Sequence, residues 1–376
     1  MKSIAEVDVE NKAVFLRVDW NLPLKDGKIV DDNRIKSTLP TINYLRKKNC
    51  RIIIGTHLGR PEGKIVHELS TKILAKKLLE LLPETNILQT DFVVEPEVKK
   101  FVENLETKEI LILGNLRWHR EEEENNPKFA KILASYADIF VNDAFAVSHR
   151  AHASVEAITK YLPSYAGVLL EKEVVSLSVL TENPRHPFIL ILGGAKIKDK
   201  IGLIEKFAPV CDKILVGGCL AITLQYSRGK KVSKSKFESN VSDIAKRIFK
   251  VAGKKLILPV DQKIKKIGKK DFSIMDIGDK TLLLFKKEIR NAKTIFWNGN
   301  VGYSESKKFE SGTLGIARAV RRNKFVKIVA GGDTVGFLKS HKIVDNFTFI
   351  STGGGAALEF LAGEKLPGLV ALGYYK

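Results

Sequence analysis

Short apolar runs in the first half of the chain lead directly into charged and polar residues. The residues of this kind are Asp19, Asn21, Arg34, His57, Arg60, Arg117, His149, Arg150 and His152. Arginine is the favoured bidentate partner of carboxylate and phosphate groups. Several arginines gathered at one sheet edge repel one another unless an anion joins them. The pattern therefore predicts a pocket for a small, multiply charged anion.

Histidine in such a position is more often structural than catalytic. His57 and His149 become candidates only because arginines follow them closely in the chain. The group formed by His149, Arg150 and His152 has no carboxylate or thiol close by in the sequence. A metal site at these histidines is therefore disfavoured.

In the second half of the chain, glycines follow the apolar runs. In Gly193–Lys200 (GGAKIKDK), two glycines at a predicted strand-to-helix turn precede Lys196 and Lys200, which are four residues apart and so share one face of a helix. Glycine permits close backbone approach, and a helix N-terminus carries partial positive charge, which together suit a polyphosphate. An ordinary helix start with solvated lysines is the alternative explanation of this motif taken alone.

Two further glycine motifs follow later runs. Gly331–Thr334 (GGDT) adds a carboxylate and a hydroxyl, which suit Mg²⁺ and phosphate oxygens, and Ser351–Gly355 (STGGG) is a third flexible turn. Each motif is weak alone, but together on neighbouring strand ends they favour a nucleotide site. The common nucleotide signatures are missing from the sequence, since Gly59–Lys64 (GRPEGK) has the wrong spacing for a phosphate-binding Walker loop.

The apolar runs alternate with helix-length segments, as is typical of buried parallel strands in βαβ units. In the first half we predict strands at 13–18, 51–55, 110–113 and 139–142. In the second half the runs are Phe188–Gly194, Lys213–Gly218, Lys255–Asp261, Thr294–Gly299, Lys327–Asp333 and Phe347–Gly355. Helices are predicted at Leu69–Leu82 and Phe129–Tyr136, and Gly167–Leu180 is predicted to connect the two halves as a hinge helix. Two substrates on two domains are the expectation, because ligands of such sheets lie at the carboxyl ends of the strands.

The composition is that of an ordinary globular protein, with 376 residues, 44% hydrophobic and 28% charged. Cys50, Cys211 and Cys219 are scattered without metal-ligand spacing, and Met1–Glu10 carries acids where a signal peptide is apolar. These features predict a cytoplasmic protein.

The net charge of +20 would suit a protein that binds nucleic acid or an acidic substrate. A lysine-rich solvated surface is the favoured explanation, because the clusters Arg228–Lys236 and Lys263–Lys270 lack the interleaved aromatic residues on which bases stack.

A collinear set of motifs extends from about residue 13 to the C-terminus. The motifs are RVDWN (Arg17–Asn21), DDNRI (Asp31–Ile35), HLGRP (His57–Pro61), NLRWH (Asn115–His119), VNDAFAVSHRAHAS (Val141–Ser154), GGAKIKDKI (Gly193–Ile201), WNG (Trp297–Gly299), GGDT and STGGGAALEFLAG (Ser351–Gly363). Together they resemble the phosphoglycerate kinase family.

The resemblance implies an α/β fold of two doubly wound parallel-sheet (Rossmann-like αβα) domains. Residues 1–166 would form a 3-phosphoglycerate-binding domain, residues 167–362 a nucleotide-binding domain, and the tail 363–376 would pack back on the first domain. The implied activity is reversible phosphoryl transfer between 1,3-bisphosphoglycerate and MgADP, giving 3-phosphoglycerate and MgATP in glycolysis and gluconeogenesis. A cytoplasmic monomer that requires neither nucleic acid nor membrane is expected.

The resemblance also assigns roles to matching positions. Those implied for the phosphoglycerate pocket are Asp19, Asn21, Arg34, His57, Arg60, Arg117 and Arg150. Those implied for the nucleotide are Gly194, Lys196, Lys200, Gly217, Asn298, Glu305, Gly332, Asp333 and Thr334, with Asp333 as the Mg²⁺ ligand. Arg34, Lys196, Gly353 and Gly354 are implied to act on the transferring phosphoryl group.

The chain departs from the family pattern on the nucleotide half. The family usually has glycine, proline and glycine at the positions occupied here by Cys219, Asn300 and Ala330, respectively. The stretch from Asp261 to Asp276 is also much shorter than is usual in the family. Asn300 is therefore expected to leave its loop looser, unless its side chain makes a hydrogen bond of its own. The alternatives are a catalytically weak homologue whose basic surface binds nucleic acid or another partner, and another carboxylate kinase of the same fold.

Overall fold

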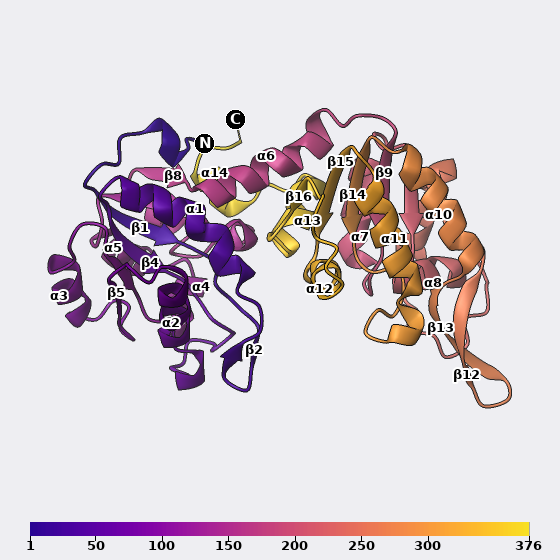
Figure 1. Cartoon of the computed structure of the whole chain (residues 1–376), viewed down its shortest axis with the longest axis horizontal. Helices are drawn as coiled ribbons and strands as arrows, with labels where there is room; N and C mark the ends of the chain where they lie inside the picture. Colours follow the sequence, from indigo (N-terminus) through magenta and orange to yellow (C-terminus); the bar gives the residue numbers. More distant parts are fainter. Residues whose placement is uncertain (376) are drawn as a thin grey trace. The chain divides into compact units, whose positions relative to one another are not determined.

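The computed structural model describes residues 1–375, which form two compact α/β units (Figure 1). The first unit is Met1–Val174 together with the chain from Lys365 onward, and the second is Val175–Glu364. Each contains a parallel six-stranded sheet with interleaved helices, as the sequence predicts. In the described part of the chain, no helix is long and apolar enough to span a bilayer.

The first unit is built on a sheet whose strands pair in the order β5-β6-β4-β1-β7-β8, all parallel. The strands are β1 (Ala13–Arg17), β4 (Arg51–Gly55), β5 (Ile87–Gln89), β6 (Ile110–Ile112), β7 (Ile139–Asn142) and β8 (Ser164–Ala166). A small hairpin, β2 (Leu24–Lys25) with β3 (Lys28–Ile29), lies outside this sheet. The four strands predicted here are confirmed to within a residue.

Helices cover both faces of this sheet because alternate strand residues are buried on each side. Val14 and Leu16 belong to a core shared with α1 (Asn33–Lys47) and α2 (Lys72–Leu81), whereas Phe15 belongs to a core shared with α3 (Glu97–Glu103) and α5 (Pro127–Ala134). Two shorter helices, α4 (Arg120–Glu123) and α14 (Pro367–Ala371), complete the unit.

The second unit has the strand order β11-β10-β9-β14-β15-β16. Its strands are β9 (Phe188–Leu192), β10 (Lys213–Val216), β11 (Leu256–Ile257), β14 (Thr294–Asn298), β15 (Val326–Ala330) and β16 (Phe349–Ile350). Five of the six predicted runs contain a whole strand of this sheet, and the sixth, Lys327–Asp333, overlaps β15, which begins one residue earlier. The strands end before the glycines and aspartates, which form the loops at the carboxyl edge.

Both faces of the second sheet are also covered. One core contains side chains of α10 (Asp279–Asn291), α11 (Ser311–Arg322) and α12 (Gly332–Ser340). On the other face, Phe207 of α7 (Lys198–Phe207) meets Phe188 edge to face and stacks on Phe296, with ring centroids 5.6 and 6.4 Å away. The remaining elements are α8 (Gly218–Tyr226), α9 (Ser242–Ala252), α13 (Gly355–Ala362) and the antiparallel hairpin β12 (Gln262–Ile267) with β13 (Asp271–Ile277). This hairpin occupies the short stretch noted in the sequence.

The connecting helix α6 (Val168–Glu182) passes through the boundary between the units, which falls after Val174 and not at residue 166. Its first turn is bound by the first unit, because Asp143 Oδ1 accepts the N–H groups of Leu169 and Leu170 at 2.9 and 3.1 Å. The boundary therefore lies inside the helix.

The C-terminal segment is held in the first unit by backbone hydrogen bonds. Gly368 N–H donates to the Ser148 carbonyl at 2.9 Å, and the amino group of Met1 donates to the Gly373 carbonyl at 2.8 Å. The second unit accordingly ends at Glu364, close to the predicted start of the tail.

Candidate active site

A cluster of charges lies at the carboxyl edge of the first sheet, centred on Asp19. The Asp19 carboxylate forms an ion pair with Nη1 of Arg34, and its Oδ1 lies 3.9 Å from Nε2 of His57. The Asn21 N–H donates to the same Oδ1 at 3.1 Å. Asn21 in turn accepts the Gly59 N–H through Oδ1 at 2.9 Å, which fixes the loop that carries Arg60. Residues from the loops after β1 and β4 and from the start of α1 are thus brought together.

Arg117 and His57 are buried among other cations. Arg117 Nη1 donates to the Gly59 carbonyl at 3.2 Å. Burial, with Arg17 and Arg150 close by, lowers the pKa of Arg117 to about 10 despite the nearby Glu123. Burial and the charges of Arg17 and Arg117 hold the pKa of His57 well below its usual value. His57 is therefore neutral at physiological pH, and the surrounding arginines supply the positive charge.

The outer members of the cluster are more accessible. Arg60 is exposed, and Arg150 is half-buried with Nε 3.4 Å from Nε2 of His149. Burial and then the charge of Arg150 lower the pKa of His149. The cluster therefore has a buried part, formed by neutral His57 and cationic Arg117, and a more accessible cationic part formed by Arg60 and Arg150. This arrangement suits an anion that enters from solvent.

A buried ion network beneath this cluster was not predicted. Arg17, fully buried at the end of β1, donates through Nε to Ser154 Oγ at 2.7 Å and lies 3.7 Å from Glu122 Oε1. Burial opposes ionisation of Glu122, but the neighbouring His152 and Arg17 outweigh it and lower its pKa. The network reaches His57, because Nη2 of Arg17 lies 3.5 Å from Nδ1 of His57. Its only sequence signal was a charged residue inside an otherwise apolar strand.

Tightly packed glycine loops form the carboxyl edge of the second sheet. Gly193 follows β9, and a Cβ atom there would lie 2.1 Å from the Asn300 carbonyl oxygen. At Gly217, after β10, a Cβ atom would lie 2.4 Å from Cβ of Val301. The Gly194 N–H donates to the Asn300 carbonyl at 3.0 Å. The glycines are therefore required by loop-on-loop packing, in addition to any ligand.

The two lysines of the first glycine motif have different environments. Helix α7 begins only at Lys198, so the predicted shared helix face is wrong: Lys196 lies before the helix and is exposed. Lys200 is buried, and its Nζ donates to Oδ1 of Asn298 at the end of β14. Burial lowers the pKa of Lys200 to about 8, although the charges of Asp199 and Asp333 oppose the shift.

Asp333 and Thr334 lie in the first turn of α12, directly after β15. Gly332 and Asp333 are exposed, whereas Thr334 is buried and its Oγ1 accepts the Gly299 N–H at 2.9 Å. Asn298 donates through Nδ2 to the Ala330 carbonyl at 2.8 Å, so the substitution of alanine for glycine at this position leaves the contact intact. The loops after β14 and β15 are thus tied together, and Asp333 beside them remains exposed.

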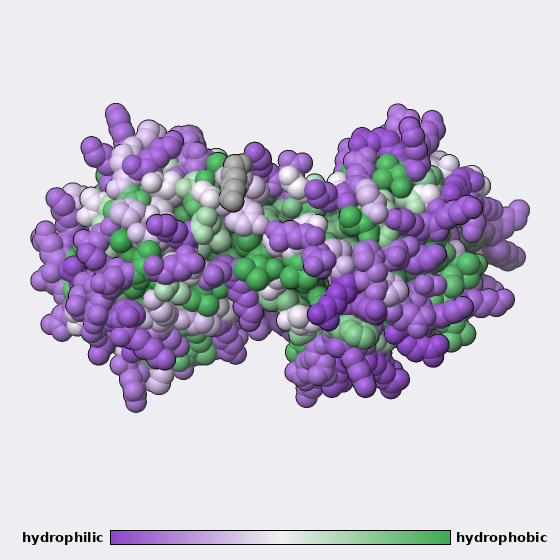
Figure 2. All heavy atoms as spheres, turned by 90° about the horizontal axis from the view of Figure 1, so that it is seen from above, coloured by the Kyte–Doolittle hydropathy of each residue, from purple (hydrophilic) through white to green (hydrophobic). Residues whose placement is uncertain are grey.

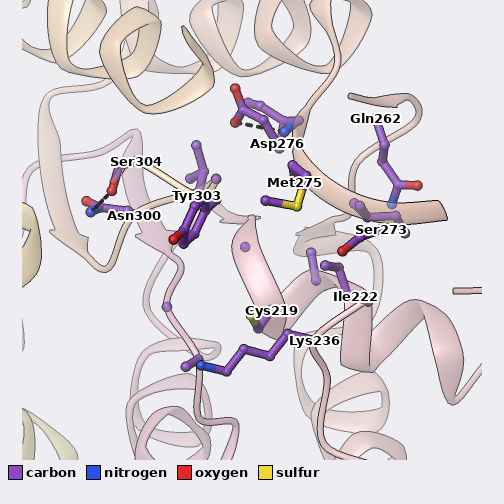
Figure 3. A pocket seen from close by; sticks show the side chains of 18 of the residues that line it. Cys219, Ile222, Lys236, Gln262, Ser273, Met275, Asp276, Asn300, Tyr303 and Ser304 are labelled. Atoms are coloured by element: carbon purple, nitrogen blue, oxygen red, sulfur yellow. Dashed lines mark hydrogen bonds between the residues drawn. The ribbon is translucent and has the colours of Figure 1, made fainter. Parts of the chain in front are cut away.

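A cavity of about 380 Å³ opens beside these loops (Figure 3). Gly194, Gly218, Asn300, Glu305 and Asp333 line it on the side of the sheet edge. Its other walls come from α8, the segment after α8 and the β12–β13 hairpin. In the view of Figure 3, Cys219 of α8 and Lys236 of that segment lie below Met275 and Asp276 of the hairpin. The hairpin therefore closes the cavity that the altered loops border.

The Asn300 side chain orders its own loop. Its Nδ2 donates to Ser304 Oγ at 2.6 Å, the dashed contact in Figure 3. The loop is also fixed by Val301, whose carbonyl accepts the Gly218 N–H at 2.7 Å. The expectation of a looser loop is therefore not supported by the contacts, and the alternative explanation, a hydrogen bond made by the asparagine, describes the structure.

The last glycine loop precedes α13. Gly354 has φ of +53°, a conformation that other residues adopt at a cost, and Gly353 donates its N–H to Ser351 Oγ at 3.1 Å. Among residues 1–375, no group of three or more histidine, cysteine or acidic side chains is arranged to hold a metal ion.

Comparison with known proteins agrees with this two-sided geometry. Residues 4–364 match the family described as phosphoglycerate kinase. The chain belongs to the phosphoglycerate kinase family. It is accordingly a kinase, a transferase with the glycolytic role of that family. Phosphoglycerate kinases of Finegoldia magna and Coprothermobacter proteolyticus are 43% and 42% identical to it, with 98% and 99% of this chain and 98% of each relative covered.

Solved phosphoglycerate kinases share the fold. The structure from Coxiella burnetii has a TM-score of 0.87 at 35% identity, and that from Pyrococcus horikoshii OT3 has 0.86 at 31%. Both alignments cover 99% of this chain and 98% of the other. The similarity of this phosphoglycerate kinase family member to its relatives therefore includes both units.

Proposed function

We propose that this chain transfers a phosphoryl group reversibly between 1,3-bisphosphoglycerate and MgADP, giving 3-phosphoglycerate and MgATP. The observation that carries the proposal is the pairing of two unlike sites in a member of this family. One unit has a cationic pocket around Asp19, and the other has glycine loops with a buried lysine, Lys200. The first suits a small anion and the second a polyphosphate.

In this proposal the first unit binds 3-phosphoglycerate. Arg60, Arg117 and Arg150 surround its phosphate, and His57, which is neutral, can donate a hydrogen bond without adding charge. Asp19 and Asn21 bind its hydroxyl side and hold Arg34 in position. Arg34, a third exposed at the rim of the pocket, is left to stabilise charge on the transferring group.

The second unit binds the nucleotide in the cavity beside Gly194 and Gly217, with Glu305 at its border. Lys196 and Lys200 approach the phosphates, and Gly353 and Gly354 offer backbone N–H groups to the transferring group. The single exposed carboxylate of Asp333 fits Mg²⁺, which proteins usually hold by one or two carboxylates together with substrate phosphates. When bound, Mg²⁺ neutralises charge on the phosphate oxygens.

The chemistry requires no general base. A carboxylate oxygen of 3-phosphoglycerate attacks the γ-phosphorus, and the bond to the bridging oxygen of ADP breaks. The carboxyl group is already ionised at neutral pH, so no proton is removed. Catalysis then consists of alignment and of charge stabilisation of a loose transition state by Arg34 and Lys196. We expect the enzyme to act in the cytoplasm as a monomer, and its three cysteines are free thiols.

A coupled assay tests this proposal. Purified protein with MgATP and 3-phosphoglycerate should form an acyl phosphate that a coupling dehydrogenase reduces. Arg34→Ala should lower kcat by about 10²- to 10³-fold, because loss of one donor to a transition state costs about 2.7–4 kcal/mol. Arg46→Ala, on the same helix but not assigned to the pocket, is the matched control and should retain kcat.

The readouts separate the possible outcomes. Folded protein without turnover on any purine nucleotide would overturn the proposed activity. A normal kcat in Arg34→Ala, with only KM for 3-phosphoglycerate raised, would leave the activity but remove the role assigned to Arg34.

A further inference from the structure

A second hollow lies in the nucleotide-binding unit, between α10 and α11, which run side by side (Figure 1). Its volume is about 780 Å³, and its lining comes from these two helices and the segment directly after α11. None of the residues assigned to catalysis or nucleotide binding lines it. We call this hollow the α10–α11 groove.

The groove is lined by cations. They are Lys286, Lys287, Arg290, Arg318, Arg322 and Lys324. All are exposed, and none forms an ion pair with another part of residues 1–375. The described lining includes no aspartate or glutamate. Part of the net charge of +20 is therefore concentrated here without an internal partner.

The cations form two rows. Lys286 and Arg290 are one turn apart on α10, and Arg318 and Arg322 are one turn apart on α11. Arg290 and Arg322 lie in the last turns of α10 and α11, where a cation stabilises the negative end of the helix dipole. The helix dipole does not explain the cations that lie earlier in the helices, such as Lys286.

The floor of the groove is rigid. At Gly315 a Cβ atom would lie 2.7 Å from Leu282, so glycine permits the close approach of the two helices. Buried Asn323 donates through Nδ2 to the carbonyls of Ile289 and Ala292 at 2.9 and 2.8 Å, which joins the ends of α10 and α11. The two helices that carry the rows of cations are therefore held at a fixed separation.

Apolar side chains accompany the charges. Phe325 and Leu283, both in the lining, are 46% and 68% exposed. A positively charged groove that follows a phosphate backbone, with an aromatic ring on which a base stacks, is the usual design of single-strand binding sites. A hollow suits a chain-like ligand better than a flat membrane surface. The lysine-rich β12–β13 hairpin offers charge but lies outside this groove.

We propose that the α10–α11 groove binds single-stranded nucleic acid, with the backbone along the two rows of cations and a base stacked on Phe325. The contact is independent of phosphoryl transfer, because it uses none of the residues assigned to that reaction.

Fluorescence anisotropy with a labelled oligouridylate tests the proposal. The groove variant Lys287→Gln/Arg318→Gln/Arg322→Gln should bind at least about tenfold more weakly than the wild type, and the slope of log K against log salt should fall by about 2. The matched control Lys265→Gln/Lys266→Gln/Lys270→Gln removes the same charge from the β12–β13 hairpin and should remain within about threefold. Both variants should retain kcat in the coupled assay, which shows that they fold.

Phe325→Ala distinguishes a nucleic acid from other polyanions. It should weaken oligouridylate binding by about fivefold or more without changing the salt slope, because stacking carries no charge. It should leave the binding of inorganic polyphosphate unchanged. Equal losses in the groove and hairpin variants, no effect of Phe325→Ala, or stronger binding to phosphatidylserine vesicles than to oligouridylate would each overturn the proposal.

Discussion

At the scale of single residues, burial makes Lys200 responsive to pH. Its pKa is lowered to about 8 chiefly by burial. Near pH 8 about half of the Lys200 side chains are therefore neutral in the free protein. Nucleotide phosphates favour the charged amine, so binding must raise this pKa and take up protons.

The first prediction follows from this coupling. Calorimetric titration with ADP at pH 8, in buffers of different ionisation enthalpy, should show net proton uptake. Affinity should fall as the pH rises through 8, because the free energy of charging the lysine is added to the cost of binding. Lys200→Arg should show neither effect, since a guanidinium stays charged. Binding with no proton uptake and no pH dependence in the wild type would place the nucleotide phosphates away from Lys200.

Individual residues also mark where sequence reasoning stopped. The spacing of Lys196 and Lys200 predicted a shared helix face, but the helix starts at Lys198, because the glycine turn extends further than the pattern indicates. Arg17 belongs to the motif RVDWN, but the sequence did not predict its role, because its partners Glu122 and Ser154 are distant in the chain. The spacing of residues in the sequence shows which side chains are neighbours on one helix or strand, whereas a buried network joins side chains from several elements.

At the scale of elements, the start of α6 depends on a buried acid. Asp143 accepts two N–H groups of the first turn, and at Gly167 a Cβ atom would lie 2.2 Å from its Oδ1, so glycine is required there. Burial raises the pKa of Asp143 from 3.8 to about 6. The folded state thus binds this proton more tightly than the unfolded state, and the resulting stability, complete below about pH 4, is lost as the pH rises through 6.

The second prediction concerns Asp143→Asn, which keeps an oxygen acceptor for the helix but cannot ionise. The stability of the wild type relative to this variant should fall by up to about 3 kcal/mol between pH 4 and pH 7, since one pKa unit corresponds to about 1.4 kcal/mol. Urea unfolding of both proteins across this range measures the difference. A difference in unfolding free energy that stays constant from pH 4 to pH 7 would contradict the prediction, because it would mean that Asp143 does not change its protonation state in this range.

The third prediction revises the expectation for the loop after β14. Asn300→Pro restricts the conformations open to the loop before ADP binds, a gain of about 0.4–1 kcal/mol on the scale of proline substitutions, but it removes the hydrogen bond to Ser304, which costs about 1 kcal/mol. ADP affinity should therefore change by less than about twofold. Ser304→Ala removes only the hydrogen bond and should weaken ADP binding by about fivefold. An increase in ADP affinity of more than fivefold in Asn300→Pro would contradict this prediction and would indicate that the loop is loose in the wild type.

Elements with strong local patterns were predicted well, and weakly patterned ones were not. The central strands are buried on both faces, so their apolar runs stand out, and β1 and β9 match their predictions. Strand β8 was missed because Ser164–Ala166 is short and only partly apolar. Helix α1 was missed although its face packs into the core, because Pro40 and several polar residues interrupt its pattern. Whether such weakly patterned elements form a helix or a strand depends on tertiary packing more than on the local sequence.

At the scale of the whole molecule, the two sites divide the reaction between the units. The residues assigned to 3-phosphoglycerate all belong to Met1–Val174, and those assigned to the nucleotide all belong to Val175–Glu364. Transfer of the γ-phosphoryl group directly to a carboxylate requires both substrates to be bound together with water excluded. An enzyme of this design should therefore transfer the group to its acceptor and not to water.

Phosphorus NMR of a mixture of the protein, MgADP and 1,3-bisphosphoglycerate tests this central claim most directly, because transfer from an acyl phosphate to ADP is the favourable direction. We predict that the ATP signals grow as the acyl phosphate signal falls, and that this happens only when ADP is present. Inorganic phosphate should not accumulate faster than in the absence of protein. Release of inorganic phosphate in step with loss of the acyl phosphate, or an unchanged ADP spectrum with folded protein, would contradict the account.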